Sequence, residues 1–384
     1  MNNTDLKHLI QKQKSNFSLD QEFYINQHIF DLDIKNIFSK QWVFVGHVSR
    51  IPNYGDYFLF NIGKESIIII RDKDNSVHAH YNVCRHRGSH ICLENEGNTK
   101  ALICPYHAWT YNLDGSLRGA RLMEKGFDKT QWHLHECNVK IFEGLIFINL
   151  SEKPNSFEEF ISPTKKFIEF HGLADAKIAH RQYYPTHGNW KLTLDNFHEC
   201  YHCHPSHPEY CQVHDKEYII AYGAGSNTGP ASDKFDKVLS EWNEKVNKMG
   251  HLTGEYSETE FNDYSRSAER TPLKEGMFTE TKSGQPISKL MGKFKDYDCG
   301  YTSVGTSPFN SLLMCNDFAT LFTFIPVSPL YTQVELMWLV HKDAEEGKDY
   351  NLDEMKWMWD VTTIADKRII EDNQKGVLSE KYVP

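Results

Sequence analysis

The sequence has no long apolar run and no excess of basic residues. Its longest apolar runs, at 67–70 and 321–327, are far shorter than the ~20 residues that a helix needs to cross a bilayer. The formal net charge of −10 argues against a nucleic-acid binder, which needs a basic face. The first residues, MNNTDLKHLIQKQKSNFSL, contain no apolar core of signal-peptide length. We therefore expect no membrane, no nucleic-acid partner and a cytoplasmic location.

Cysteine is sparse and odd in number. The chain has 9 cysteines among 384 residues and shows no secretion signal, so free thiols or metal ligands are favoured over disulfides. Histidine is more informative, because several of the 20 histidines stand beside cysteines or carboxylates. A chain of this length can form two domains, each with its own core.

The first half of the chain has the pattern of short strands. Between residues 41 and 150, runs such as WVFVGHV, YFLFNI and SIIIIRD are rich in aromatic and β-branched residues and are separated by turn formers. Asp114-Gly115 predicts one hairpin, and IFEGLIFINL predicts another at the end of this region. We therefore expect a β-rich domain here.

The second half mixes helices and strands. Residues 189–203 repeat apolar side chains at helical spacing, and 225–300 is polar and glycine-rich, which predicts long loops. Strands are expected again in SLLMCNDFATLFTFIPV and TQVELMWLVHK. The segment 352–375 predicts a long helix with Gly376 as its C-cap.

A first group of candidate metal ligands lies in the β-rich half. Cys84 and His86 form a C-x-H hook, and Cys104 and His107 form a C-x₂-H hook. In a Rieske [2Fe–2S] cluster, two thiolates bind one iron and two imidazoles bind the other. A Cys₂His₂ zinc site is the competing interpretation, but zinc ligands usually come as a cysteine pair followed by a histidine pair. Four unrelated residues are the remaining alternative.

A second group of candidate ligands lies in NWKLTLDNFHECYHCHPSHPEY. Glu199 and His202 are expected on one helical face, and His207 follows after Pro205 has ended the helix. Two imidazoles with one carboxylate from elsewhere form the facial triad of non-heme Fe(II) oxygenases. A zinc site made by His202 and His207 with Cys200 and Cys203 is the alternative.

The motifs CRHRG and CPYHAWTYNLDGSLRG resemble the Rieske domain of the ring-hydroxylating oxygenase α-subunit family, and the resemblance extends from about Phe17 onward. It implies an α+β fold. A β-rich Rieske domain at 41–155 would be followed by a catalytic domain at 156–384, with a helix on an antiparallel sheet (helix-grip, START-like). Residues 1–40 would pack on the catalytic domain.

The resemblance also supplies roles that the residues alone do not. Asp366, in WMWDVTTIADKRIIEDNQKGV, falls where the family has its iron-binding carboxylate; alone it would be a solvated acid, like Asp360, Glu371 and Asp372. In this family, the cluster of one subunit faces the iron of its neighbour within a trimer. Glu199 would bridge the two centres by linking a cluster histidine, His107, to His202.

The implied function is that of a terminal oxygenase, which uses O₂ and electrons from a separate NAD(P)H-dependent reductase of flavin or ferredoxin type. E-C-Y-H, RTPLKEGMFTETKSGQPISKLMG and WLVHKDAEEGKDY resemble the branch that N-demethylates betaines and related quaternary ammonium compounds. The alternatives are a ring-hydroxylating dioxygenase, a Rieske electron carrier and an inactive scaffold.

A quaternary ammonium substrate can be bound by aromatic faces. Two or three of the candidate rings are expected to face the iron, and the others to be core residues. The candidates are Phe197, Tyr301, Phe309, Phe318, Phe322 and Phe324.

Overall fold

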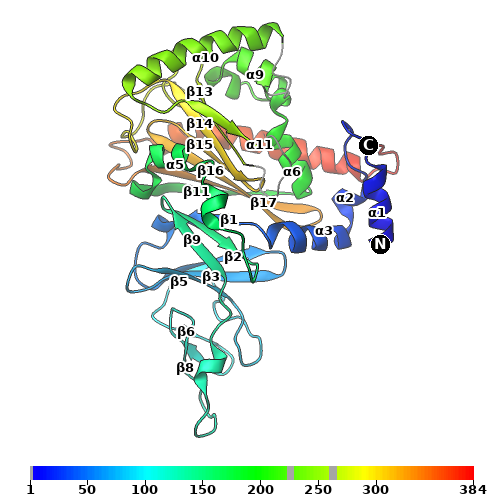
Figure 1. Cartoon of the computed structure of the whole chain (residues 1–384), viewed down its shortest axis with the longest axis vertical. Helices are drawn as coiled ribbons and strands as arrows, with labels where there is room; N and C mark the ends of the chain where they lie inside the picture. The colour runs from blue at the N-terminus through cyan, green and yellow to red at the C-terminus, as the bar shows by residue number, and fades with distance from the viewer. Residues whose placement is uncertain (1–2, 223–228, 259–265) are drawn as a thin grey trace. The chain divides into compact units, whose positions relative to one another are not determined.

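The computed structural model describes residues 3–222, 229–258 and 266–384. The chain folds into two compact units: the small unit is Phe38–Phe157, and the large unit combines Met1–Ile37 with Glu158–Pro384 (Figure 1). The expected division into 1–40, 41–155 and 156–384 stays a prediction. None of the described helices is both long and apolar enough to traverse a bilayer.

The small unit consists of short antiparallel strands. They pair in the orders β1-β10-β9, β4-β3-β2-β5 and β6-β7-β8. The strands are β1 (Val43–His47), β2 (Asp56–Ile62), β3 (Glu65–Arg71), β4 (Val77–Tyr81), β5 (Glu96–Asn98), β6 (Leu102–Ile103), β7 (Thr110–Tyr111), β8 (Leu117–Gly119), β9 (Asn138–Phe142) and β10 (Leu145–Asn149). Both predicted hairpins are confirmed, because β7 pairs with β8 and β9 pairs with β10.

The core of the small unit surrounds the two Cys/His hooks. Ile68 and Ile70 of β3 are fully buried and pack in one cluster with Cys84, Cys104 and Trp109. Burying an isoleucine side chain stabilises a fold by roughly 1.5–3 kcal/mol. The loops that carry the cysteines are therefore held by packing as well as by their own hydrogen bonds.

The described residues of the large unit form a seven-stranded antiparallel sheet in the order β11-β17-β16-β15-β14-β13-β12. The strands are β11 (Ala176–Thr186), β12 (Gly254–Ser257), β13 (Ser267–Pro272), β14 (Gly300–Ser307), β15 (Asn310–Met314), β16 (Phe318–Ser328) and β17 (Tyr331–His341). Almost every residue of β16 and β17 is buried, so both faces of the sheet are covered at its centre.

Helices cover this sheet. The α-helices are α1 (Asn3–Lys12), α2 (Glu22–Ile25), α3 (Gln27–Asp33), α4 (Phe157–Ile161), α5 (Lys165–His171), α6 (Trp190–His198), α7 (Cys203–Ser206), α8 (Tyr210–Val213), α9 (Lys216–Tyr222), α10 (Pro230–Met249) and α11 (Leu352–Val377). Short 3₁₀ or π turns lie among these helices at η1 (Ile34–Phe38), η4 (Leu173–Asp175) and η5 (Cys200–His202). Two further 3₁₀ turns, η2 (Val48–Arg50) and η3 (Lys129–Trp132), lie among the strands of the small unit. The long α11, red in Figure 1, contacts β11 and α6. The expected α+β class, with a helix on an antiparallel sheet, is confirmed.

The expectation of long loops over 225–300 was right for 273–299, which holds no helix or strand, and wrong for the described residues before it. The helix α10 spans 20 residues, and β12 and β13 complete the sheet. Phe235, Trp242 and Val246 are buried on one stripe of α10, which shows that an amphipathic pattern was present in the polar sequence. The parts of this stretch at 225–228 and 259–265 lie outside the described residues.

The predicted C-cap of the last helix was also wrong. Gly376 lies inside α11, which ends at Val377 with Leu378 as its cap. Val377 is buried in a cluster with Tyr24, Leu192 and Ile370. The packing of this last turn against the N-terminal helices carries the helix past the glycine.

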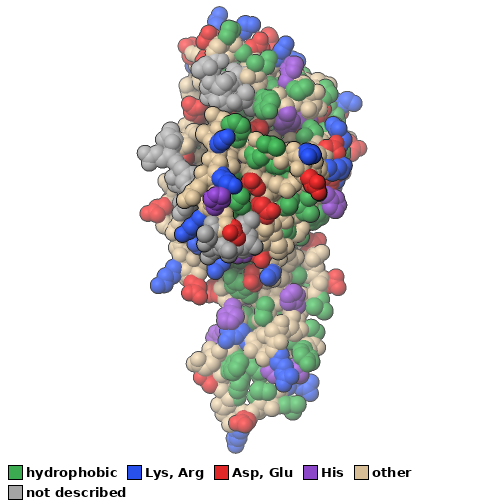
Figure 2. Space-filling model, turned by 90° about the vertical axis from the view of Figure 1, so that its right-hand side faces the viewer, with side chains coloured by type: hydrophobic (Ala, Val, Ile, Leu, Met, Phe, Trp, Pro, Cys, Tyr) green, Lys and Arg blue, Asp and Glu red, His purple; other side chains and the backbone are tan. Residues whose placement is uncertain are grey.

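The face of the molecule drawn in Figure 2 carries charges of both signs. On the face drawn in Figure 2, Lys and Arg side chains alternate with Asp and Glu side chains among the described residues. Broad basic patches of the kind that nucleic acids require are not seen among the described residues of that face.

Candidate metal centres and active site

The two Cys/His hooks of the small unit adopt the same backbone turn. In each hook the cysteine N–H donates to the carbonyl five residues on, and the N–H four residues on donates to the cysteine carbonyl. The pairs are Cys84 with Ser89 at 2.8 Å and Gly88 at 2.9 Å, and Cys104 with Trp109 at 2.8 Å and Ala108 at 3.0 Å. The residue four positions on has a positive φ in both hooks, 75° at Gly88 and 56° at Ala108. Glycine accepts this conformation readily, whereas at Ala108 no feature of the sequence signalled it.

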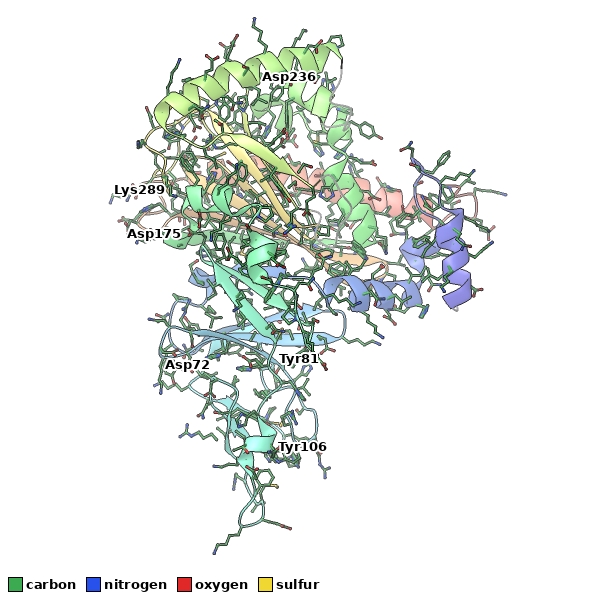
Figure 3. The ribbon with its side chains drawn as sticks, viewed as in Figure 1. Asp72, Tyr81, Tyr106, Asp175, Asp236 and Lys289 are labelled. Carbon is green, nitrogen blue, oxygen red and sulfur yellow. A yellow bond between two sulfur atoms is a disulfide. The ribbon has the colours of Figure 1, made fainter. Side chains whose placement is uncertain are left out.

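The paired turns bring four candidate ligands together. The imidazole centroids of His86 and His107 are 4.6 Å apart, and the Cys84 and Cys104 side chains are buried close enough to interact. Among the described residues, His86 Nδ1 is buried and has no hydrogen-bond partner. Tyr106, labelled in Figure 3, is 59% exposed at the tip of the second hook.

This donor set fits a [2Fe–2S] cluster. Two thiolates and two imidazoles are the ligands of a Rieske centre, and the buried, unpartnered nitrogen of His86 is a donor that a metal would satisfy. The Tyr111 hydroxyl lies 3.4 Å from Cys84 Sγ, close enough to hydrogen-bond a sulfur ligand. Cys92 and Cys137 are buried free thiols, as expected.

The second group of ligands comes from a chain of short turns in the large unit. The helix α6 ends at His198, Glu199 is its C-cap, and η5 carries His202. The expectation that Glu199 and His202 share a helical face was therefore wrong. Pro205 does not end a helix either, because it lies in the first turn of α7, where N–H groups have no intrahelical partner.

Three side chains nonetheless converge. Asp366 Oδ1 lies 3.2 Å from His202 Nε2 and 2.9 Å from His207 Nε2. Burial raises the pKa of Asp366, but hydrogen bonds from the two imidazoles outweigh burial and leave this pKa below its ordinary value. Two imidazole nitrogens and one carboxylate oxygen form the donor set of a mononuclear Fe(II) site.

The zinc alternative fails on the state of the cysteines. His202, Cys203 and His207 are close enough together to hold a metal ion, but Cys203 is bonded to Cys200 in a disulfide. Neither sulfur is then a thiolate ligand. The expectation that the chain has no disulfide was wrong, because the turn at η5 brings the two Cα atoms to 5.1 Å, within the range that a disulfide spans.

Several residues that support the iron ligands were missed in the sequence. Glu209 Oε1 lies 3.3 Å from His207 Nδ1 and accepts a hydrogen bond from Thr362 Oγ1 at 2.9 Å. Asn196 Nδ2 lies 3.3 Å from His202 Nε2, the nitrogen that also faces Asp366, so Asn196 lines the iron site and does not hold the imidazole from behind. Carboxylates behind metal-binding histidines orient the ring and raise its basicity.

The other acids of α11 do not all face solvent. Asp360 accepts hydrogen bonds from Tyr184 Oη at 2.5 Å and Gln182 Nε2 at 3.2 Å, and Glu371 accepts from the His187 N–H at 3.0 Å. Both bind α11 to β11 and the turn after it, which corrects the expectation of solvated acids. Asp372 is exposed, as expected.

Glu199 presents its carboxylate to solvent in the single chain. Its carbonyl oxygen, 2.9 Å from His202 Nδ1, is the atom that contacts the imidazole. The bridging role of Glu199 stays a prediction.

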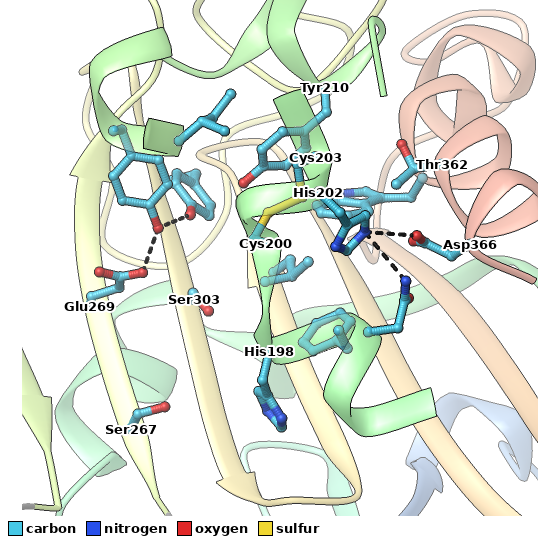
Figure 4. Close-up of a pocket in the computed structure, with 17 residues that line it drawn as sticks. His198, Cys200, His202, Cys203, Tyr210, Ser267, Glu269, Ser303, Thr362 and Asp366 are labelled. Carbon is cyan, nitrogen blue, oxygen red and sulfur yellow. Dashed lines mark hydrogen bonds and ion pairs between the residues drawn. A yellow bond between two sulfur atoms is a disulfide. The ribbon is translucent and has the colours of Figure 1, made fainter. Parts of the chain in front are cut away.

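A cavity of about 260 Å³ opens beside the iron ligands (Figure 4). It is lined by His202 and Asp366 and by a group of aromatic side chains. These are Phe197, Tyr210, Tyr218, Tyr301 and Trp359.

Two of the predicted rings, Phe197 and Tyr301, line this cavity, while Phe309, Phe318 and Phe322 are core residues. Phe324, the remaining candidate, is buried as well. Trp359 and Thr362 also line the cavity, and a signal for them existed, because they lie seven and four residues before Asp366 on one face of the helix. Glu269, on β13, lines the cavity and had no signal in the sequence.

The fold, the two Cys/His hooks and the group of two histidines and one aspartate together define a class of protein. Comparison with known proteins identifies this class. Residues 41–142 match the Rieske [2Fe-2S] domain, and residues 173–384 match the ring hydroxylating alpha subunit (catalytic domain). The chain belongs to the Rieske oxygenase family, as the α-subunit that carries a [2Fe–2S] cluster and a mononuclear iron. It is an oxidoreductase, and its activity depends on electrons from a separate reductase.

Individual relatives are more specific. The chain is 35% identical over 379 residues to the glycine betaine monooxygenase oxygenase subunit of Pseudomonas aeruginosa, covering 98% of this chain and 86% of the relative. It is 38% identical over 197 residues to the carnitine monooxygenase oxygenase subunit of Escherichia coli K12. This match covers 50% of this chain and 52% of the relative. A solved quaternary ammonium Rieske monooxygenase, described with carnitine oxidation and inter-subunit electron transfer, superposes with a TM-score of 0.70 at 25% identity, covering 94% of this chain and 86% of that one.

Proposed function

We propose that this protein oxidatively N-demethylates a quaternary ammonium compound, most closely a betaine, with O₂ and electrons from a separate reductase. The observation that carries the proposal is the cavity beside His202 and Asp366. Five aromatic side chains line it, and none of its described lining residues is Lys or Arg. The relatives named for glycine betaine and carnitine support the same substrate class.

The cavity suits a cation without N–H donors. A quaternary nitrogen cannot donate a hydrogen bond, so the ring faces are the groups that attract it, by up to about 2 kcal/mol per desolvated ring. An anionic arene such as benzoate would find no Lys or Arg side chain among the described lining residues.

The ligands follow from the geometry. Cys84, His86, Cys104 and His107 would hold the cluster, which supplies electrons singly. His202, His207 and Asp366 would hold the iron, which activates O₂ when it is bound. The aromatic side chains would exclude water and orient one N-methyl group toward the iron ligands.

The proposed reaction balances as a monooxygenation. The N-methyl group, O₂, two electrons and two protons give an N-hydroxymethyl group and water. The N–CH₂OH bond then breaks, the nitrogen keeps the electron pair, and formaldehyde and a proton leave. The products are a tertiary amine and formaldehyde.

Electron transfer would run between subunits of a homotrimer. The exposed carboxylate of Glu199 would bridge His202 to His107 of the partner subunit. The exposed Ile103 and Tyr106 beside the second hook offer apolar surface for a neighbouring chain. The reductase would be an NAD(P)H-dependent flavin or ferredoxin type, and both proteins would act in the cytoplasm.

A substrate screen tests the function. Purified holoprotein with a surrogate reductase should release formaldehyde from glycine betaine, proline betaine or carnitine, and it should give no diol from benzoate or biphenyl. A cis-diol from an arene, with no formaldehyde from any methylammonium compound, would instead establish a ring-hydroxylating dioxygenase. Cluster reduction without O₂-dependent product would establish an electron carrier.

The bridge has its own test. Glu199→Gln should leave cluster and iron contents unchanged and the cluster reducible, while product formation falls severely. Normal product yield in a single turnover by this variant would refute the bridging role. Sedimentation of the wild-type holoprotein should give three chains per particle.

A further inference from the structure

One carboxylate lines the cavity away from the iron ligands. Glu269 is half-buried on β13, and its Oε1 accepts a hydrogen bond from Tyr218 Oη at 2.7 Å. Tyr218 Oη in turn lies 3.0 Å from Tyr301 Oη. Figure 4 shows Glu269 on the side of the cavity opposite His202 and Asp366.

The protein itself provides Glu269 with little positive charge. Its cross-strand partner is Glu255 of β12, a second acid, and the ion pairs of the described residues include no Lys or Arg for Glu269. Burial first, and then the charge of Glu255, raise the pKa of Glu269, while the hydrogen bond from Tyr218 and the nearby His214 imidazole oppose them. A carboxylate in a cavity, with no Lys or Arg partner among the described residues, is a group that a positive ligand would complete.

The surrounding rings are held in place. His214 stacks on Tyr210 with centroids 4.0 Å apart and meets Tyr301 edge-on at 4.7 Å. His214 Nε2 lies 3.0 Å from Glu280 Oε1, which fixes the imidazole between the two rings. A cage that is ordered before the ligand arrives loses little conformational freedom on binding.

We infer that Glu269, held by Tyr218 and Tyr301, is the counter-charge to the quaternary nitrogen and sets the preference for a cation over a neutral group of the same shape. The inference rests on the proposed function and adds to it the residue that determines specificity. The rings recognise the methyl groups by their faces and shape. The carboxylate recognises the charge.

A matched pair of ligands separates charge from shape. Glycine betaine has a positively charged nitrogen where 3,3-dimethylbutanoate has a neutral carbon atom. The two ligands have the same three methyl groups and the same carboxylate. Dissociation constants are measured by calorimetry on the holoprotein for both ligands. The variants are Glu269→Gln, which keeps the size of the side chain, and Glu255→Gln, which removes an exposed charge outside the cavity from the facing strand.

The wild type should bind glycine betaine more tightly than 3,3-dimethylbutanoate. Glu269→Gln should raise the dissociation constant of glycine betaine on the order of 10- to 100-fold and leave that of 3,3-dimethylbutanoate unchanged or lower. Glu255→Gln should change both dissociation constants less than about threefold. Cluster absorbance and iron content should match the wild type, which shows that the variant is folded.

Failure of the inference and failure of the proposed function give different results. If the wild type binds and demethylates glycine betaine but Glu269→Gln binds it equally well, the inference is overturned and the proposed function stands. If the wild type neither binds nor demethylates any quaternary ammonium compound, both are overturned. An equal loss for both ligands in Glu269→Gln also overturns the inference, because the residue would then support shape rather than charge.

Discussion

The two candidate metal centres are built in different ways. In the small unit, Cys84, His86, Cys104 and His107 come from two copies of one turn that are close in sequence. In the large unit, His207 and Asp366 are 159 residues apart and meet because α11 packs against β11 and α6. A centre made by local turns depends on its own hydrogen bonds, whereas a centre made by distant helices depends on the packing of the whole unit.

Removing one ligand from each centre tests this comparison most strongly. Asp366→Ala should lower turnover by at least ~10³-fold and leave the cluster spectrum intact, because an iron site with three protein ligands loses its only carboxylate. Cys84→Ser should abolish the Rieske absorption and electron paramagnetic resonance signals and spare the mononuclear iron. Asp372→Asn, an exposed acid on the same helix, is the control. Full activity in Asp366→Ala would show that another carboxylate binds the iron.

Loosening the packing should affect only the large unit. Asp298 is fully buried, accepts hydrogen bonds from Arg270 at 2.8 and 2.9 Å and lies 2.8 Å from His251 Nδ1. Asp298→Ala leaves the buried Arg270 without a counter-charge and should cost about 3–5 kcal/mol of unfolding free energy. Denaturant unfolding followed by tryptophan fluorescence measures this cost, and cluster absorbance reports the small unit. Simultaneous loss of both signals at the same denaturant concentration would contradict independent units.

The same group predicts a pH dependence. Burial raises the pKa of Asp298, but Arg270 and the hydrogen bonds from His251 and Asn316 outweigh burial and hold this pKa below 3.8. Because the folded-state pKa is lowered, the stabilisation is complete above the unfolded-state value and is lost as the pH falls through the folded-state value. Acid unfolding of the large unit below about pH 4 should therefore be less steep in Asp298→Ala than in the wild type.

Weakening the support behind one ligand should have a smaller effect. Glu209→Gln keeps a side chain beside His207 but removes the charge that orients and polarises the ring, and it should lower Fe(II) affinity about 10- to 100-fold. Competition with a chelator measures the affinity without turnover. Thr362→Val removes the hydrogen bond to Glu209 and keeps the carboxylate. Its Fe(II) affinity should lie between those of the wild type and Glu209→Gln. Unchanged iron retention in Glu209→Gln would show that the 3.3 Å contact has no effect on the ligand.

The smallest expected effect distinguishes the two hooks from each other. Gly88 and Ala108 share the positive-φ position, but only alanine is strained there. Gly88→Ala should cost about 1 kcal/mol, and nothing near its Cβ would clash. Ala108→Gly should be neutral or stabilise by up to about 1 kcal/mol, since relief of strain opposes the greater freedom of the unfolded chain. Melting of the cluster absorbance measures both. If Gly88→Ala and Ala108→Gly changed the melting temperature by the same amount in the same direction, the two hooks would not share this backbone geometry.

Sequence reasoning succeeded where chemistry is local. The sequence predicted that the side chains within each Cys/His hook, and those of His202 and His207, lie close together. The structure also brings them together, because the few residues between them limit how far apart they can lie. It failed at Glu199 and Pro205, where a single helical turn decides the geometry. The 3₁₀ turn at η5 and the start of α7 are too short to leave a periodic pattern.

The amino-acid order by itself determined the class of cofactors and the hairpins of the small unit, since both arise from contacts over a few residues. The residue pattern of α11 did not distinguish its acids, and only the family resemblance named Asp366. The tertiary structure shows the difference: Asp366 faces the histidines, whereas Asp360 and Glu371 bind the neighbouring strand and turn. It also decided that Glu269 lines the cavity, because β13 and α11 come from distant parts of the sequence. The physical reason is that a side chain's partner across a sheet or between helices depends on register and packing, which no local pattern encodes.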